Sequence, residues 1–423
     1  MNVLFIHQAF PAQFGRLSLE LTKRYGWTCD FLVENLSSCP TPSAEMLERL
    51  KLYRIPTPTE ARDQAPTPWP QIHAKYLGLC SAVFHAAEGI PDLKPDLIVG
   101  HGGRGSPTVF LPDLFDCPIL NYCEYYFSTD PRSDISYRID LPPANDVAPF
   151  FPRCINAPVL VALTNADGGY SATRWQKQSF PKRFHPKIEV QFDGIDTEIY
   201  CPKEGTPRVI AGRAIPKGTK IVTFVARGLE SMRGFDVFMK VAARIARQRS
   251  DVLFVIAGND HAYYGWDPLH VGQASFKSWV LDRVKHDPDR FLFTGQVSPE
   301  VLADILRLSD LHLYLTVPFV LSWSLLDAMA CGCVVLGSDV PPVREVIDNG
   351  IHGLIEPLFD LDRLTETALR VLDDPATYKP LGNAARARME ADYSLDVCVP
   401  RLKDYFERMA SRRLASALPD ADV

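Results

Sequence analysis

Residues 319–347 constrain the fold more than any other part of the 423-residue chain. Ser324 is suited to cap a short helix that Gly332 ends. The apolar run at residues 333–336 then predicts a strand covered on both faces, and Glu345 opens a second helix, where the helix dipole favours a carboxylate. This order of loop, helix, buried strand and helix is typical of a parallel α/β sheet, which gathers ligand-binding groups at the carboxyl ends of its strands.

Short apolar runs separated by helical segments recur along the whole chain, and this alternation predicts two parallel sheets with helices on their faces. The predicted strands of the first half are residues 3–6, 30–33, 97–99, 118–120, 159–163 and 188–190. Those of the second half are residues 221–226, 252–257, 291–293, 311–314 and 333–336. Between the two series, the turn-rich segment 193–207 predicts a domain boundary.

Composition narrows the class of protein. The length suggests two or three domains at about 150 residues each. The net charge of −6 and the pI near 6.0 provide no large basic field, which argues against a nucleic-acid partner. Because the first residues lack the features of a signal peptide and no apolar run is long enough to cross a bilayer, we expect a cytoplasmic protein. The ten cysteines are then expected to be reduced thiols rather than disulfides or metal ligands.

The run Leu-Asp-Ala-Met-Ala-Cys-Gly within residues 319–347 resembles the donor site of glycosyltransferase family 4. That family has two glutamates in this segment. The second falls on Asp327 and the first on Phe319. The resemblance implies that Asp327 holds the nucleotide ribose and that Phe319 forms an apolar wall beside the donor sugar. From the residues alone, Ser324 and Asp327 also have the spacing of a helix capping box.

The resemblance extends over nearly the whole chain and implies the GT-B fold, in which two Rossmann-like domains face each other across a cleft. It implies an N-terminal acceptor-side domain at residues 1–203 and a nucleotide-sugar donor domain at residues 204–392. A C-terminal helix at residues 393–412 would return to the first domain, followed by a frayed tail at residues 413–423.

Two arginines follow the strand predicted at residues 221–226. Arg227 comes just after the strand and Arg233 just before Gly234, where the family has an Arg and a Lys that clamp the donor pyrophosphate. Guanidinium groups suit this task because they form paired, charge-assisted hydrogen bonds to phosphate oxygens. The resemblance implies that both arginines stabilise the departing diphosphate. By the residues alone, two solvated loop cations are the alternative.

His101 ends the run of residues 95–101, which contains the strand predicted at residues 97–99, and precedes a glycine-rich loop at residues 102–105. A side chain in that position faces the ligand crevice of an open α/β sheet. In the family, a histidine there touches the donor sugar, so the resemblance implies this catalytic role for His101. A hydrogen bond that stabilises the loop is the alternative.

The acceptor-side candidates follow two other strands of the first half. Gln13 and Phe14 follow the first strand, and Glu124 and Tyr125 follow the strand at residues 118–120. These side chains could meet an acceptor by hydrogen bonds and ring stacking, with structural packing of the rings as the alternative. The remaining donor-side candidates lie near strand ends and helix starts of the second half: Gly258, Asn259, Ser322, Ser324, Leu325 and Glu345.

The sequence therefore predicts a hexosyl- or related glycosyltransferase that moves a sugar from a nucleoside diphosphate sugar to an acceptor hydroxyl in glycan, polysaccharide or glycolipid biosynthesis. The resemblance implies retention of anomeric configuration, no cofactor and no bound metal. The acceptor would be a glycan, a lipid-linked molecule or a small molecule. A nucleotide-sugar epimerase-like enzyme and a non-catalytic GT-B scaffold are the alternatives.

Residues 174–187 mix cations with large aromatic side chains. Two interpretations are open. The segment could contact an anionic membrane surface where a lipid-linked acceptor lies, or it could be a solvated helix and loop near the domain hinge.

Overall fold

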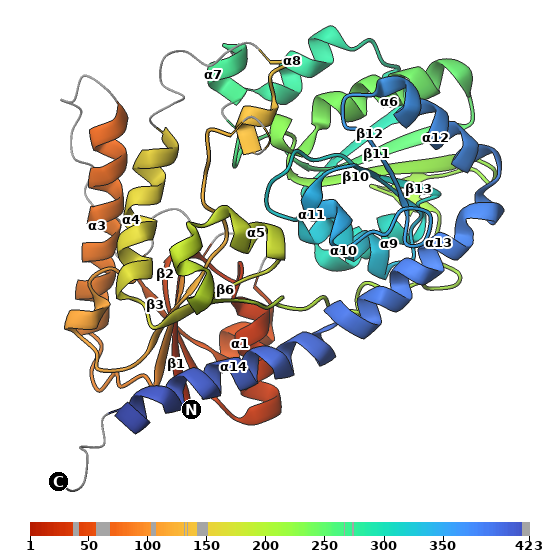
Figure 1. Ribbon diagram of the computed structural model, residues 1–423. Coiled ribbons are helices and arrows are strands. Elements are labelled where there is room, and N and C mark those ends of the chain that lie inside the picture. The colour runs from red at the N-terminus through yellow and green to blue at the C-terminus, as the bar shows by residue number, and fades with distance from the viewer. Residues whose placement is uncertain are drawn as a thin grey trace, which may run out of the picture. The chain divides into compact units, whose positions relative to one another are not determined.

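The computed structural model describes residues 1–36, 42–55, 68–102, 107–130, 132, 134–141, 151–265, 267–272 and 275–416. The chain divides into two compact α/β units (Figure 1). Unit 1 comprises residues 1–127, 147–194 and 396–423, and unit 2 comprises residues 128–146 and 195–395.

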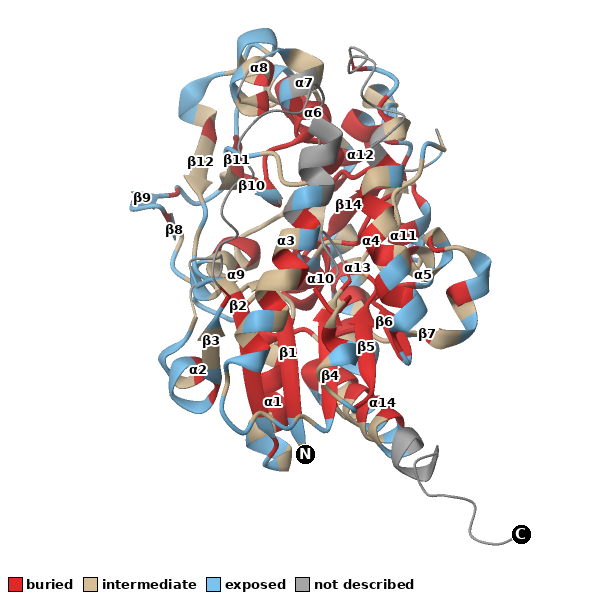
Figure 2. Cartoon of the chain, turned by 90° about the vertical axis from the view of Figure 1, so that its left-hand side faces the viewer, coloured by how far each residue is buried: buried red, intermediate tan, exposed pale blue. Residues whose placement is uncertain are grey.

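Unit 1 contains a seven-stranded parallel sheet in the order β3-β2-β1-β4-β5-β6-β7. Its strands are β1 (Asn2–Ala9), β2 (Thr28–Asn35), β3 (Lys51–Arg54), β4 (Leu97–His101), β5 (Ile119–Tyr122), β6 (Gly168–Ser171) and β7 (Ile188–Val190). Its α-helices are α1 (Gly15–Tyr25), α2 (Ala44–Arg49), α3 (Pro68–Glu88), α4 (Phe151–Asn165), α5 (Arg174–Ser179) and α14 (Leu395–Ser416). Figure 2 shows that the central strands are buried along most of their length, which explains their continuous apolar sequences.

Unit 2 contains a six-stranded parallel sheet in the order β12-β11-β10-β13-β14-β15. Its strands are β10 (Lys220–Gly228), β11 (Val252–Asn259), β12 (Phe291–Gly295), β13 (Leu311–Tyr314), β14 (Val335–Ser338) and β15 (Leu354–Glu356), with a small antiparallel ribbon of β8 (Val209–Ile210) and β9 (Arg213–Ala214). Its α-helices are α6 (Phe235–Gln248), α7 (Asp267–Val271), α8 (Phe276–Arg283), α9 (Pro299–Arg307), α10 (Trp323–Ala330), α11 (Pro341–Arg344), α12 (Leu361–Asp373) and α13 (Pro375–Arg388).

Each sheet has a point where the strand order reverses, between β1 and β4 in unit 1 and between β10 and β13 in unit 2. In open α/β sheets, chain connections leave such a point in opposite directions, and ligands bind outside the carboxyl ends of the two strands. The loops after these four strands are therefore the candidate ligand-binding regions of the two units.

Helix α14 belongs to unit 1 although it follows unit 2 in the sequence. The hydroxyl of Tyr405 donates to the Gly169 carbonyl over 2.9 Å, and the Phe406 ring lies 5.9 Å from the Tyr170 ring. Both rings of α14 are buried, so the helix covers the sheet of unit 1 at β6.

The division of the chain differs from the predicted boundaries, 1–203 and 204–392, most clearly in two places. Unit 1 ends its main part at Gly194, and residues 128–146 belong to unit 2. The second difference has a physical cause, because the guanidinium of Arg138 in this segment is buried against Asp236 of α6. The last residues of the predicted tail, 417–423, lie outside the described residues.

One predicted strand is wrong. Residues 159–163 lie inside α4, which buries Val159 and Leu163 on one side. A short apolar run of this kind fits a buried helix as well as a buried strand, so periodicity alone does not separate the two.

Among the helices that the structure describes, none is both long enough and apolar enough to cross a membrane.

Candidate functional site

Buried carboxylates fix the loop that follows β10 in unit 2. Glu230 accepts hydrogen bonds from the backbone amides of Tyr264 (2.8 Å) and Gly265 (2.9 Å), and burial raises its pKa. Asp267 accepts the amide of Ser231 over 3.2 Å. The loop ends at Gly234, where φ is +64° and a Cβ atom would lie 2.6 Å from the Leu315 carbonyl oxygen. Only glycine fits there, so the turn that carries Arg233 closes tightly onto α6.

Arg233 is held in a single position in this turn. Its Nη1 donates to the Val320 carbonyl over 2.7 Å and contacts the Thr316 hydroxyl at 3.4 Å. The guanidinium carbon lies 5.5 Å from the Tyr264 ring and 5.6 Å from the Phe319 ring. Only 7% of the residue is exposed, so a fixed positive charge sits beside the strand-order reversal of unit 2.

Phe319 differs from the expected apolar wall. Only 1% of its surface is exposed, and its ring packs edge-on against Tyr264 at 5.1 Å. In the position of the family's first glutamate, this ring therefore packs beside the Arg233 guanidinium instead of presenting a surface to a sugar.

Arg227 lies at the end of β10 and is exposed. Its guanidinium lies 4.0 Å from the centre of the Tyr263 ring, and the Asn259 amide donates to the Tyr263 hydroxyl over 3.1 Å. At Gly258 a Cβ atom would lie 2.3 Å from the Ala226 carbonyl oxygen, so β11 requires a glycine there. The structure thus brings together three of the predicted donor-side residues at the ends of β10 and β11.

The predicted cap of α10 is wrong by two residues. The N-cap is Ser322, whose hydroxyl accepts the Ser324 amide over 3.3 Å, because Ser322 has extended backbone angles while Ser324 is already helical. The two hydroxyl oxygens lie 3.0 Å apart. With Ser322 as N-cap, the capping-box position falls on Leu325, so the capping-box interpretation of Asp327 is also wrong. The Leu325 side chain is fully buried and packs inside unit 2.

Asp327 projects from the middle of α10, and 8% of the residue is exposed. Burial raises the pKa of its carboxyl well above the usual value. No residue in the described part of the chain forms a hydrogen bond with this carboxyl group. A nearly buried acid without a donor is costly, and hydroxyl groups of a bound ligand could supply the missing hydrogen bonds.

Glu345 does not open a helix, which corrects another prediction. Helix α11 begins at Pro341 and Pro342, whose fixed backbone angle suits a helix start, and Glu345 caps its carboxyl end. The helix dipole disfavours a carboxylate at that end. The Arg388 guanidinium donates to the Glu345 carbonyl over 3.1 Å, which fixes the backbone there.

In unit 1, His101 lies at the end of β4 among aromatic and polar groups. Its ring is 4.6 Å from the His7 ring, and its Nε2 is 4.0 Å from a carboxylate oxygen of Glu124. The rings of Phe14 and Tyr122 lie 6.2 Å and 5.1 Å from it. The structure therefore gathers predicted residues from the ends of β1, β4 and β5, while residues 103–106 of the glycine-rich loop lie outside the described residues.

Tyr125 is buried and packs edge-on against the Phe127 ring at 5.5 Å, which agrees with the packing alternative for this residue.

Within the described ranges, no group of three or more His, Cys, Asp or Glu side chains is arranged to hold a metal ion.

Two family models match most of the chain. The model described as "Glycosyl transferase family 4 group" matches residues 38–200, and "Glycosyl transferases group 1" matches residues 207–388. The chain belongs to glycosyltransferase family 4.

Individual relatives are distant. The family member is 25% identical to the alpha-D-kanosaminyltransferase of Streptomyces kanamyceticus over 189 residues, which cover 45% of this chain and 46% of that protein. The chain thus spans about half the length of this relative and of a second curated relative that it matches.

Solved structures share the fold. Sucrose-phosphate synthase from Thermosynechococcus elongatus has a TM-score of 0.71 at 16% identity, covering 97% of this chain and 100% of that one. Anabaena HepE in complex with UDP-glucose has a TM-score of 0.66 at 14% identity, covering 96% and 100%. Two parallel-sheet α/β units with these likenesses show that this glycosyltransferase family member has the GT-B fold.

Asp193 is a buried acid of unit 1 that the sequence analysis missed. The Gln13 amide donates to one of its carboxylate oxygens, and the other oxygen has no partner among the described residues. Only 5% of the residue is exposed, and burial raises its pKa to about 8. Its place just after β7, at the sheet edge that holds His101, was the available signal, but the turn-rich surroundings pointed only to a domain boundary.

Asp193 should make stability fall as pH rises. Its folded-state pKa of about 8 lies above the value of about 3.9 for an unfolded chain, so the folded protein binds the extra proton between these pH values. Asp193→Asn should remove this dependence, gaining stability over the wild type at pH 8 and little at pH 4. Urea unfolding from pH 4 to pH 8.5 measures it. Asp130→Asn is the control, because Arg132 holds the pKa of Asp130 at about 2, below this range. An unchanged slope in Asp193→Asn would contradict the assignment.

Proposed function

We propose that this protein is a glycosyltransferase that moves a sugar from a nucleoside diphosphate sugar to an acceptor hydroxyl. The observation that carries the proposal is Arg233, a nearly buried guanidinium fixed at the strand-order reversal of unit 2. Arg227 adds a second guanidinium at the end of β10. Negative charge develops on the departing diphosphate during sugar transfer, and preorganised cations stabilise it there.

Asp327 supports the nucleotide part of this proposal. Its nearly buried carboxyl suits the paired hydroxyls of a ribose, as the family resemblance implies. His101 remains the candidate for positioning the donor sugar. Since Phe319 is buried, hydroxyls of that sugar would be held by other groups, of which the partly exposed Glu345 is the candidate.

The comparisons favour transfer over the alternatives. The relative named above is a kanosaminyltransferase, and the HepE structure holds UDP-glucose. The first name supports sugar transfer, the second supports a nucleoside diphosphate sugar as the donor, and neither supports an epimerase. The unpaired acid at Asp327 and the fixed cation at Arg233 argue against a scaffold without a ligand.

We further propose retention of anomeric configuration, a role in glycan, polysaccharide or glycolipid biosynthesis, and a cytoplasmic location, all on the family resemblance.

Catalysis is also proposed to need no divalent metal, because Arg227 and Arg233 supply the positive charge that a metal ion would otherwise bring to the diphosphate. Turnover should therefore be unchanged in excess EDTA. Activity that EDTA abolishes and magnesium or manganese restores would contradict this.

We propose that residues 174–187 contact an anionic membrane surface by electrostatic attraction and not by inserting aromatic rings. Phe180 and Phe184 are buried in a core cluster of unit 1 and are not available to insert among lipids, whereas Lys182 and Arg183 are exposed. Sedimentation with anionic vesicles should show binding that salt reverses. No binding at low salt would remove the proposal.

Arg233→Ala and Arg227→Ala should each weaken the binding of UDP, or of GDP or ADP if one of these binds better, by about tenfold or more. This follows from charge-assisted hydrogen bonds worth about 1.5–3 kcal/mol. Binding of the matching nucleoside, which lacks the phosphates, should change little. Calorimetric titration measures both affinities, and Arg247→Ala, an exposed arginine on α6, is the control. Equal losses for nucleoside and diphosphate would contradict the assignment.

Asp327→Asn should weaken nucleoside diphosphate binding by roughly 1.5–3 kcal/mol, the range for hydrogen bonds to a charged group. Its folding stability should not fall, because the substitution removes a buried acid that has no donor. The wild type should prefer the nucleoside diphosphate over its 2′,3′-dideoxy analogue, and the variant should lose this preference. A variant that keeps the preference in full would show that Asp327 does not hold the ribose.

A further inference from the structure

Residues 128–141 belong to unit 2 although they lie in the first half of the sequence. The backbone amide of Asp134 donates to the Pro318 carbonyl over 2.9 Å, next to Phe319 in the loop after β13. The Tyr137 ring stacks on the Phe359 ring with centroids 5.5 Å apart. The segment therefore packs against the loops after β13 and β15 of unit 2.

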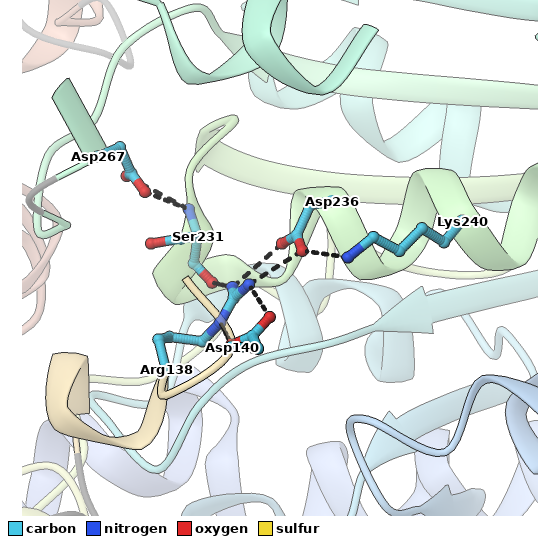
Figure 3. A network of polar contacts seen from close by, with 6 residues as sticks. All are labelled: Arg138, Asp140, Ser231, Asp236, Lys240 and Asp267. Atoms are coloured by element: carbon cyan, nitrogen blue, oxygen red, sulfur yellow. Dashed lines mark hydrogen bonds and ion pairs between the residues drawn. The ribbon is translucent and has the colours of Figure 1, made fainter. Parts of the chain in front are cut away.

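Arg138 binds this segment to the loop after β10 and to α6 through a network of polar contacts (Figure 3). Its side chain has no exposed surface, and all five of its N–H groups have an acceptor. Nε and Nη2 donate to Asp140 over 2.8 and 2.9 Å. Nη1 and Nη2 donate to the two carboxylate oxygens of Asp236 over 3.1 and 2.9 Å, and Nη1 also donates to the Ser231 carbonyl over 2.6 Å. A guanidinium with every donor used is fixed in both place and orientation.

The Ser231 contact connects Arg138 to the donor site. Ser231 begins the short turn Ser231–Arg233, whose last residue carries the proposed diphosphate-binding guanidinium. Its carbonyl is held by Arg138 and its amide by Asp267, so side chains from outside the turn fix both of its backbone groups (Figure 3). The position of Arg233 therefore depends on a residue that the family's donor motif does not include.

Stability alone does not account for this arrangement. Burial would raise the pKa of Asp236, but the charges of Arg138 and Lys240 outweigh burial and lower it, so both partners of the pair are charged. The desolvation penalty of two buried charges offsets most of their electrostatic attraction. Well-packed apolar side chains therefore often replace such pairs without loss of stability. What apolar side chains do not replace is the directional hydrogen bond to the Ser231 carbonyl.

We propose that Arg138 is a positioning residue of the donor site: it holds the turn Ser231–Arg233 in the geometry that binds the diphosphate. The role of this turn in binding rests on the proposed function, whereas the clamp on Ser231 does not.

The first test is Arg138→Lys, which keeps the positive charge. A lysine ammonium is a point charge without the planar fork, so it should not bridge Asp236, Asp140 and the Ser231 carbonyl together. The dissociation constant for UDP, or for the nucleoside diphosphate that binds best, should rise about tenfold, while that of the nucleoside stays the same. Arg132→Lys is the matched control, because this exposed arginine of the same segment pairs with Asp130 and has no other ion pair among the described residues.

A double variant separates position from stability. Arg138→Met with Asp236→Leu removes the buried ion pair and fills its space with apolar atoms. This variant should unfold at a temperature close to that of the wild type, yet bind the nucleoside diphosphate at least tenfold more weakly. If Arg138→Lys fails to fold, the double variant still tests the proposal.

Hydrogen exchange tests the clamp without a ligand. Amides of residues 231–234 should exchange about tenfold faster or more in Arg138→Lys than in Arg132→Lys. If the wild type binds no nucleoside diphosphate, the proposed function fails, and the exchange rates still decide whether Arg138 fixes the turn. Folded variants with unchanged exchange, or with equal losses for nucleoside and diphosphate, would overturn the positioning role.

Discussion

Unit 2 depends on buried ionisable side chains that fix one loop through hydrogen bonds to backbone groups. Asp267 and Arg138 bind the amide and the carbonyl of Ser231 in the loop between β10 and α6, and Glu230 of the same loop accepts hydrogen bonds from the backbone amides of Tyr264 and Gly265. Main-chain contacts of this kind fix geometry independently of which side chain the loop presents. The loop therefore places residue 233 at the strand-order reversal of the sheet whether this residue is an arginine, as here, or the lysine of the family's pattern.

Each unit also keeps a nearly buried acid with unused hydrogen-bonding capacity, Asp327 in unit 2 and Asp193 in unit 1. A folding core avoids such groups because they lose hydration without gaining donors. Natural proteins accept this cost mainly where a ligand or a proton is handled. Asp193 lies in the loop after β7, and Asp327 lies on α10, the helix that follows β13, so each acid comes from a segment that leaves the carboxyl edge of a parallel sheet.

The sequence predicted what depends on periodic or consecutive apolar residues, and missed what depends on single polar side chains. The two parallel sheets and the donor segment follow from apolar runs, and the exception, residues 159–163, is a run that a buried helix accepts equally well. The sequence predicted Ser324 as the N-cap of α10, whereas the structure has Ser322. Either hydroxyl can accept the hydrogen bond, and the backbone conformation determines which serine is the cap. Arg138 and Asp236 are far apart in the chain, and no spacing rule connects them.

The replacement of an acid by Phe319 makes physical sense beside Arg233. An acidic group 5.6 Å from the guanidinium, where the ring now lies, would attract it by about 3 kcal/mol at an effective dielectric constant of about 20. An aromatic face attracts a cation by only about 0.5–2 kcal/mol. The ring therefore holds the guanidinium in place while leaving most of its electrostatic attraction for a third group. An anion with several oxygens, such as a diphosphate, gains from that difference because it does not have to displace a carboxylate first.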